Sequence, residues 1–510
     1  MGNKRAADLL VECLMNQGVS RVFGIPGESY LSVLDALVDV RNKVKFVTAR
    51  HEGAASFMAE AYGKLTGSAG ICFVTRGPGA TNASIGVHTA MQNSSPMILF
   101  IGQIGRNTTD REAFQEVDYR IFFGSIAKWV TQIDNPDRLP ELIGRAFAVA
   151  NSGRPGPVVV ALPEDMLREI TDSTPVAKIL TNSAQASTEH IKVITEALNK
   201  AKHPLIICGG GGWSDRGRIH LQSFAESKNI PVACGFRNQD LMDSTSRAYV
   251  GDASFGKSNA IKKLIVDSDL ILALNIRFGE VVTDGWTLFD FPHPKQKIIH
   301  THINESEINK IYHCEVGIVA SPDSIVKGLN AANIEVKSQK TLLIARLEFE
   351  KSRQVPKVLG SLNMAKICNY LNENADNDAI YTNGAGNFAI WPGKYLNFSK
   401  AKRLLAPQAG AMGAGIPAAI AAKSAFPDRQ VICFAGDGDF QMTCNDLGTA
   451  MQENLCPIIL IHNNGSYGTI RMHQEMRYPN RISGTELINP KFGLLAEAYR
   501  FGYARITDES

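Results

Sequence analysis

The sequence lacks the features that mark several large classes of protein. Its 510 residues carry 53 basic and 50 acidic side chains, and a net charge of +3 is too small to predict binding to nucleic acid or to an anionic membrane surface. No uninterrupted apolar run is long enough to span a bilayer, and residues 1–18 show no charged-then-apolar leader. We therefore expect a cytoplasmic protein without nucleic-acid or membrane partners.

Paired cysteines are also missing. Nine cysteines are scattered along the chain, several within apolar runs, and no two form Cys-x-x-Cys. This spacing predicts buried, reduced thiols and no zinc site. The chain is otherwise ordinary in composition, with 44% hydrophobic residues, and its length predicts about three domains.

One stretch, FAGDGDFQMTCNDLGTAMQENLCPIILIHNNGSYG (434–468), places polar residues directly after two apolar runs. We expect strands over 430–435 and 457–461 with a helix over 443–454 between them, a unit whose crossover makes the strands parallel neighbours. The carboxyl ends of the two strands then lie side by side, with Asp437 after the first and Asn464 after the second. Open parallel sheets bind their ligands at that edge.

The residue types at this edge favour a magnesium site. Asp437 supplies a carboxylate, Asn464 an amide oxygen, and the backbone at Ser466 a carbonyl, which leaves room for phosphate oxygens in the shell of Mg²⁺. Gly436 and Gly438 let backbone N–H groups approach a diphosphate. The alternative is a plain turn, because Asp-Gly is a common turn signal.

The same unit occurs twice in the chain. Residues 71–103 read ICFVTRGPGATNASIGVHTAMQNSSPMILFIGQ and resemble 432–464, although chance convergence of two strand-helix-strand units is the alternative. Arg76 and Gln103 stand in the early copy where the later copy has Asp437 and Asn464. Only the later copy can therefore hold the metal.

A third unit lies between the two copies. The runs LIICGGGG (205–212), SDLILALNIRFG (268–279) and KIIHTHIN (297–304) predict strands of a doubly wound sheet. The glycine run fits nucleotide binding and simple loop geometry equally well. His300 and His302 alternate on one strand, where ordinary hydrogen-bonded histidines are the favoured interpretation over metal ligands.

Glu52, which precedes the early copy in the same N-terminal part of the chain, is the candidate acid-base residue. It follows His51 at the start of a helix rich in small residues, where a carboxylate is expected to be partly buried. A buried glutamate beside a heteroaromatic nitrogen is able to shuttle a proton; a favourable interaction with the helix dipole is the simpler alternative.

Taken together, these motifs resemble a known family. Five motifs carry the resemblance: His-Glu-Gly-Ala-Ala at 51–55, Gly-Pro-Gly-Ala-Thr-Asn at 77–82, Ala-Phe-Gln-Glu at 113–116, Met-Gly-x-Gly-x-Pro-Ala-Ala at 412–419, and Gly-Asp-Gly with Asn-Asn. In these motifs the chain is similar to the thiamine diphosphate-dependent enzymes, specifically acetolactate synthase catalytic subunits. The resemblance covers nearly the whole chain.

The resemblance implies a fold and an assembly. The fold is α/β, with three doubly wound parallel-sheet domains: a pyrimidine-binding domain at 1–170, a Rossmann-like central domain at 189–334, and a diphosphate-binding domain at 361–510 that ends earlier than the family's usually does. The first and third are related. The family joins a glutamate from one subunit to a metal site of the next, which implies a homodimer or homotetramer.

It also implies residue roles. Glu52 contacts the pyrimidine ring of thiamine diphosphate, Gly27 belongs to the loop on that side, and Met412 supports the bent cofactor. Mg²⁺ is held by Asp437, Asn464 and Ser466, while Gln115 and Lys128 match positions near the acceptor substrate. The implied activity is a decarboxylating carboligase of small 2-oxo acids; a simple 2-oxo acid decarboxylase and a catalytically silent scaffold are the alternatives.

Two departures from the family bear on ligands. Its middle domain binds FAD through Ala-Arg-Phe and two aspartates, whereas this chain has NIRFGE at 275–280. The aspartates are absent, so FAD binding by the middle domain is doubtful and stays an open alternative. His473 replaces a tryptophan of the acceptor pocket, which predicts no strong preference for 2-oxobutyrate. Arg471 or Arg477 is then available to a substrate carboxylate.

Overall fold

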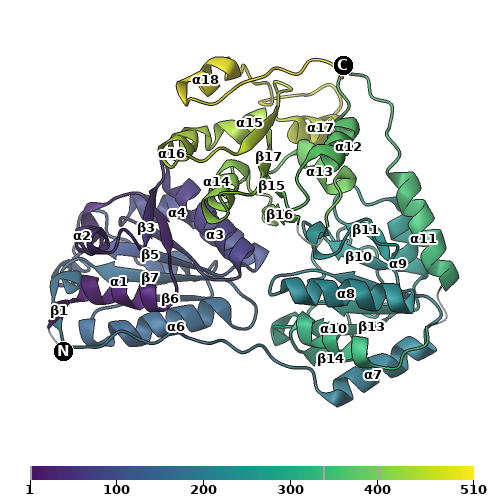
Figure 1. Ribbon diagram of the computed structural model, residues 1–510, viewed down its shortest axis with the longest axis horizontal. Coiled ribbons are helices and arrows are strands. Elements are labelled where there is room, and N and C mark those ends of the chain that lie inside the picture. The colour runs from purple at the N-terminus through teal and green to yellow at the C-terminus, as the bar shows by residue number, and fades with distance from the viewer. Residues whose placement is uncertain (1–2, 337–338, 400–401, 510) are drawn as a thin grey trace. The chain divides into compact units, whose positions relative to one another are not determined.

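The computed structural model describes residues 3–336, 339–399 and 402–509 and contains three open α/β sheets (Figure 1). A small antiparallel pair, β1 Lys4–Arg5 with β8 Ile170–Thr171, is the fourth sheet. The chain divides into two compact units. One contains residues 1–182, 382–386 and 405–503, and the other contains residues 183–381, 387–404 and 504–510. The expected α/β fold with three parallel-sheet domains is confirmed.

The first sheet has the strand order β3-β2-β4-β5-β7-β6, and each neighbouring pair is parallel. Helices connect the strands. Two of them, α1 (Ala6–Asn16) and α6 (Leu139–Asn151), pack one apolar face against the sheet, as amphipathic segments do. The strands are β2 Arg21–Gly24, β3 Lys45–Thr48, β4 Gly70–Val74, β5 Met97–Gln103, β6 Trp129–Gln132 and β7 Pro157–Pro163. The helices are α1 Ala6–Asn16, α2 Leu31–Asp39, α3 Glu52–Thr66, α4 Pro78–Asn93, α5 Tyr119–Phe123 and α6 Leu139–Asn151.

The middle sheet has the order β11-β10-β9-β12-β13-β14 and is parallel throughout. Its central strands are fully buried runs of aliphatic residues, the pattern of a sheet covered on both faces. The strands are β9 Pro204–Cys208, β10 Val232–Gly235, β11 Tyr249–Ala253, β12 Leu270–Leu274, β13 Lys297–His302 and β14 Val316–Val319. The helices are α7 Thr188–Lys200, α8 Asp215–Lys228, α9 Asn259–Asp267, α10 Pro322–Ala331 and α11 Gln339–Ser352.

The third sheet has the order β16-β15-β17-β18, with β17 and β18 parallel. The strands are β15 Ile380–Asn383, β16 Arg403–Leu405, β17 Val431–Gly436 and β18 Ile458–His462. The helices are α12 Met364–Asn374, α13 Ile390–Tyr395, α14 Gly415–Ala425, α15 Asp437–Gln441, α16 Leu447–Gln452, α17 Gly468–Arg477 and α18 Phe492–Ala498.

The duplicated unit has the expected arrangement in both places. β4 and β5 are parallel neighbours in the first sheet, as β17 and β18 are in the third. The connection in the later copy differs from expectation, because helix α15 begins at Asp437 itself and is followed by a 3-10 turn at Cys444–Asp446 and the short helix α16. In the early copy Pro78 stands at the first position of the continuous helix α4, where its fixed φ favours helix initiation.

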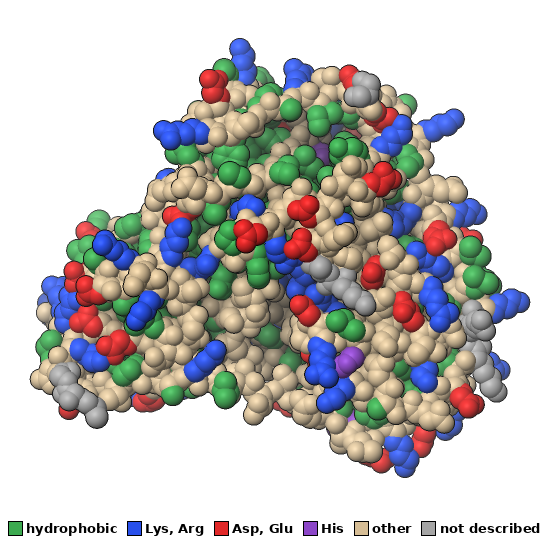
Figure 2. Space-filling view, in the orientation of Figure 1, with side chains coloured by type: hydrophobic (Ala, Val, Ile, Leu, Met, Phe, Trp, Pro, Cys, Tyr) green, Lys and Arg blue, Asp and Glu red, His purple; other side chains and the backbone are tan. Residues whose placement is uncertain are grey.

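Helix length and surface charge bear on membrane and nucleic-acid partners. No helix among the described residues is long and apolar enough to cross a membrane. Basic and acidic side chains are interspersed over the face of the molecule shown in Figure 2.

Candidate functional site

Asp437 lies at the carboxyl end of β17 and is 2% exposed. Its Oδ1 accepts a hydrogen bond from the N–H of Gly438 at 3.0 Å, and its Oδ2 accepts from the N–H of Gly465 at 2.7 Å and from Asn489 Nδ2 at 2.6 Å. Three N–H donors therefore fix the orientation of the carboxylate. The Gly438 amide, which we expected to face a diphosphate, donates to Asp437.

The loop after β18 carries the other two predicted metal ligands. Asn464 is exposed, and its Oδ1 accepts from the N–H of Ser466 at 3.1 Å. The Ser466 carbonyl accepts from the N–H of Gly468 at 2.8 Å, and its hydroxyl donates to Thr485 O at 2.9 Å. The structure therefore places Asp437 and this loop on neighbouring parallel strand ends, as the sequence predicted.

The donor set of this edge fits a hard cation. One carboxylate, one side-chain amide and one carbonyl are oxygen donors of the kind that Mg²⁺ uses when phosphate oxygens complete its shell. Groups of three or more His, Cys, Asp or Glu that could hold a metal do not occur among the described residues, and this set is not of that kind because it contains a single carboxylate.

Two residues of this edge escaped the sequence analysis. Asn489 bridges the loops, because its Nδ2 donates to Asp437 and, at 2.8 Å, to Asn463 Oδ1. Asp439 is 3% exposed, and its Oδ1 accepts from the N–H of Ala385 at 3.0 Å and of Gly413 at 2.9 Å. The second aspartate of Gly-Asp-Gly-Asp was a usable signal for Asp439, whereas nothing in the sequence ties Asn489 to a position 52 residues away.

Met412 is half-buried and lies next to a fixed backbone. Gly413 has φ +79° and donates to Asp439, and its carbonyl accepts from Thr443 Oγ1 at 2.8 Å.

A Cβ on Gly438 would lie 2.5 Å from Tyr467 Cε1, so this glycine is required by the close approach of an aromatic ring.

Glu52 is the first residue of α3 and is half-buried, as expected. The helix is capped by His51, whose Nδ1 accepts from the N–H of Gly53 at 3.0 Å. Glu52 Oε2 accepts from Asn82 Nδ2 on α4 at 3.0 Å. Buried small residues of α3 let α4 approach closely: a Cβ on Gly86 would lie 2.2 Å from Ser56 Oγ. One oxygen of the carboxylate is therefore held on α4.

Gln115 and Gly27 lie around the same segment, which connects β4 to α4. A Cβ on Gly77 would lie 2.7 Å from Gln115 Cβ, and one on Gly27 would lie 2.5 Å from Thr75 Cβ. Gly77 and Thr75 stand within a few residues of Asn82, the partner of Glu52. The structure thus gathers Glu52, Gln115 and Gly27 at the carboxyl edge of the first sheet.

Lys128 lies at the other edge of that sheet. It precedes β6, and its backbone N–H donates to Pro157 O at the amino end of β7, at 2.8 Å. Its ammonium group donates to Val149 O and, at 2.8 Å, to Ser152 O. Burial lowers the pKa of Lys128 to about 8, with Arg154 nearby as a second cause. Within this chain the side chain holds the end of α6; its contact with an acceptor substrate stays a prediction.

His473, Arg471 and Arg477 are exposed on α17, the helix that follows the Asn464–Ser466 loop. The middle-sheet histidines are bonded to the backbone: His300 Nε2 lies 2.9 Å from Ile276 O, and His302 Nδ1 accepts from the N–H of Asn304 at 2.9 Å.

The chain has three α/β domains, and two of them share a unit whose strands end in polar loops, which is the arrangement of a ligand-binding α/β protein. Comparison with known proteins specifies which. The models for the thiamine pyrophosphate enzyme match residues 4–120 with the N-terminal domain, 191–329 with the central domain and 384–510 with the C-terminal domain. The chain belongs to the thiamine pyrophosphate enzyme family.

The similar curated proteins are acetolactate synthase large subunits. That of Buchnera aphidicola subsp. Schizaphis graminum is 31% identical over 97% of this chain and 88% of its own length. That of Corynebacterium glutamicum is 32% identical over 98% and 82%, respectively, and the isozyme 2 large subunit of Escherichia coli K12 is 29% identical over 98% and 90%. The chain is therefore an acetolactate synthase-like, thiamine diphosphate-dependent enzyme.

Proposed function

We propose that this chain is a thiamine diphosphate- and Mg²⁺-dependent decarboxylating carboligase that acts on small 2-oxo acids. The observation that carries the proposal is the pairing of Asp437 with the Asn464–Ser466 loop on neighbouring strand ends. Thiamine diphosphate, when bound, supplies the carbanion chemistry that a protein side chain cannot. The residues of the chain bind and orient it and move protons.

The two half-sites divide this work. Asp437, Asn464 and the Ser466 carbonyl would hold Mg²⁺ against the diphosphate, and Asn489 would keep the Asp437 carboxylate aimed. Glu52, with one oxygen held by Asn82, would exchange a proton with the pyrimidine ring through its other oxygen. Gly27 and Gln115 border the same edge of the first sheet, where Gln115 would contact the acceptor, and Met412 would contact the cofactor rings.

We further propose that a homodimer is the smallest active form. In the family each active site combines a glutamate from one subunit with a metal site from the next, and the hydrogen bonds described here give Glu52 and Asp437 separate sets of partners. Symmetric pairing then creates two equivalent sites.

A screen of 2-oxo acids tests the activity. The full chain is incubated with thiamine diphosphate, Mg²⁺ and single 2-oxo acids, CO₂ release is followed, and the carbon products are identified. Acetoin-type or 2-hydroxy-2-methyl acid products from pyruvate support the carboligase. Free acetaldehyde alone would identify a simple decarboxylase, and no CO₂ release from any acid would identify a silent scaffold. Asp437→Ala should lose Mg²⁺-dependent activity, and the exposed Asp428→Ala serves as its control.

A further inference from the structure

The carboxyl edge of the middle sheet is the place where a dinucleotide would bind. The strand order reverses between β9 and β12, and the glycine loop at 209–212 follows β9. Ligands of doubly wound sheets lie at such a switch point, with the diphosphate against the glycine loop and the start of the next helix. In this chain that helix is α8, which is capped by Ser214.

Ile276 occupies the space beside the ends of two strands. A Cβ built on Gly209 or on Gly235 would lie 2.3 Å from Ile276 Cδ1 in either case. The isoleucine follows β12 and is 3% exposed. These glycines therefore make room for a side chain of the same chain, and the surface that a ligand would approach is already covered by packed apolar atoms.

Asn275 binds the glycine loop itself. It is 1% exposed and has φ +56°, and its Nδ2 donates to Gly211 O at 2.7 Å and to Gly209 O at 3.3 Å. Its Oδ1 accepts from the N–H of Ile303, which follows β13, at 3.2 Å. A Cβ on Gly210 would lie 2.4 Å from Asn275 O. One side chain thus ties three strand ends together where a ligand would separate them.

Other backbone polar groups of the glycine loop also have hydrogen-bond partners within the protein. The N–H of Gly210 donates to Asn238 Oδ1 at 3.2 Å, and Trp213 Nε1 donates to Gly209 O at 2.9 Å. A phosphate oxygen that replaced Asn238 as acceptor would leave a buried amide oxygen in need of a new donor.

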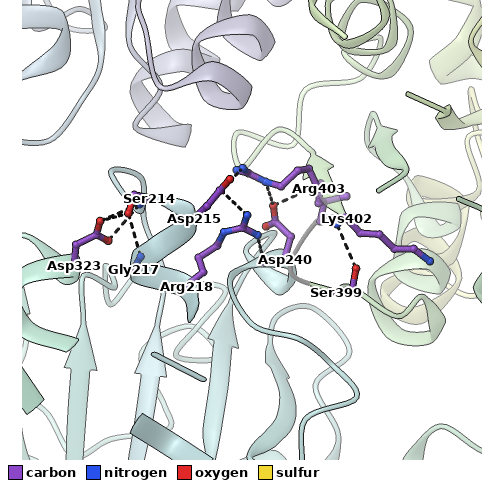
Figure 3. A network of polar contacts seen from close by, with 10 residues as sticks. Ser214, Asp215, Gly217, Arg218, Asp240, Asp323, Ser399, Lys402 and Arg403 are labelled. Atoms are coloured by element: carbon purple, nitrogen blue, oxygen red, sulfur yellow. Dashed lines mark hydrogen bonds and ion pairs between the residues drawn. The ribbon is translucent and has the colours of Figure 1, made fainter. Parts of the chain in front are cut away.

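Carboxylates stand at the start of α8, as Figure 3 shows. Asp323 accepts from the N–H of Ser214 at 3.2 Å, and a Cβ on Gly217 would lie 1.7 Å from its Oδ1. Asp215 is the first residue of the helix, and Arg218 and Arg403 pair with it at 2.6 and 3.5 Å. The Asp323 carboxylate already accepts from the backbone N–H in front of the helix, so a diphosphate bound there would have to displace it.

We propose that the middle domain of this chain binds no flavin or other dinucleotide, because Asn275, Ile276 and Asp323 close its switch point from within. The family's FAD therefore does not fit the residues present. This proposal does not depend on the proposed function, since it concerns a different sheet and is measured by binding alone.

The test uses the full chain and FAD. Protein purified from a flavin-replete host is denatured, and released flavin is measured by its fluorescence; the folded protein is then titrated with FAD and, separately, with NAD⁺. We expect flavin far below one per chain, no saturable binding and no rise in the thermal midpoint. Stoichiometric flavin, or saturable binding of either dinucleotide at micromolar concentration, would overturn the proposal.

A pair of variants identifies the barrier. Asn275→Gly combined with Ile276→Ala removes both side chains and should lower the thermal midpoint while allowing weak, saturable FAD binding. Ile276→Val keeps most of the volume and should stay unable to bind. If the double variant unfolds cooperatively yet binds no FAD, these two side chains are not the barrier.

Discussion

Asp446 in the later copy of the repeat accepts a hydrogen bond from the backbone N–H of Arg50, which follows β3, with a distance of 2.9 Å between Oδ1 and N. Arg50 in turn donates from its guanidinium group to Gly448 O at 3.2 Å and to Gln452 Oε1 at 2.8 Å. Thr449 Oγ1 donates to Thr48 O at 3.0 Å. Helix α16 therefore fixes the backbone that leads into Glu52, and Asp446 is a positioning residue for it.

Substitutions of Asp446 should distinguish a role in positioning Glu52 from a direct role in catalysis. Asp446→Ala leaves the Arg50 N–H without its acceptor, which should lower stability by about 1–3 kcal/mol and reduce kcat more than it raises KM. Asp446→Asn keeps an acceptor and should restore most of kcat. Denaturant unfolding and steady-state kinetics measure both effects. Equal kcat for wild type and Asp446→Ala would remove the positioning role.

Asp446 also has a predictable effect on the pH dependence of stability. It is fully buried, its Oδ2 has no hydrogen-bond partner among the described residues, and burial raises its pKa above the ordinary value. The folded state therefore binds this proton more tightly than the unfolded state, so this residue's contribution to stability falls as the pH rises through its folded pKa. Asp446→Asn should flatten that part of the stability profile.

Glu52→Gln should nearly abolish turnover. A glutamine keeps an oxygen for Asn82 but cannot exchange a proton, and general acid-base steps typically contribute about 10²–10⁴ in rate. Thiamine diphosphate affinity, followed by fluorescence quenching, should change by no more than a few fold. Glu497→Gln on the exposed face of α18 is the matched control. A Glu52→Gln enzyme with wild-type turnover would exclude Glu52 from proton transfer.

Asn489→Ala should weaken metal binding without removing a ligand. The substitution deletes the 2.6 Å hydrogen bond to Asp437 Oδ2, and loss of such supporting bonds typically costs about 10–100-fold in metal affinity. Titration of Mg²⁺-dependent thiamine diphosphate binding measures the change, with the exposed Asn377→Ala as control. Unchanged Mg²⁺ affinity would show that the Gly438 and Gly465 amides suffice to orient the carboxylate.

Subunit complementation should reveal shared active sites. Co-expressed, differently tagged Glu52→Gln and Asp437→Ala chains are purified as the mixed dimer, in which one site carries both substitutions and the other carries neither. Such a dimer should have about half of wild-type activity, whereas each variant alone is inactive. An inactive mixed dimer would indicate that Glu52 and Asp437 of the same chain form one site.

His300 should make the protein less stable in mild acid. Burial lowers its pKa to about 4 from an ordinary 6.5, so between these values the unfolded state binds a proton that the folded state does not. Stability is then lost as the pH falls through this window, by about 3 kcal/mol at most. His300→Gln should reduce the slope of unfolding free energy against pH, and the exposed His313→Gln should not. Equal slopes for His300→Gln and wild type would contradict the assignment.

The order of strands around Asp437 and Asn464 was predictable from the sequence. Apolar runs and a helical connection of suitable length leave parallel neighbours as the usual solution, because crossovers between strands of one sheet have few sterically allowed forms. The internal repeat predicted the matching pair β4 and β5 for the same reason. Local pattern therefore determined the fold class and the sheet edge at which Asp437 and the loop after β18 lie.

Other contacts depend on folding of the whole chain. Asn489 meets Asp437 across 52 residues, and Asp446 meets Arg50 across 396, so no local pattern encodes either pair. The glycine run at 209–212 fitted two interpretations in the sequence, and only the packing of Asn275 and Ile276 against it distinguishes them. A sequence specifies which groups are present, but burial and hydrogen-bond geometry depend on segments that meet only in the folded chain, and those decided how each group is used.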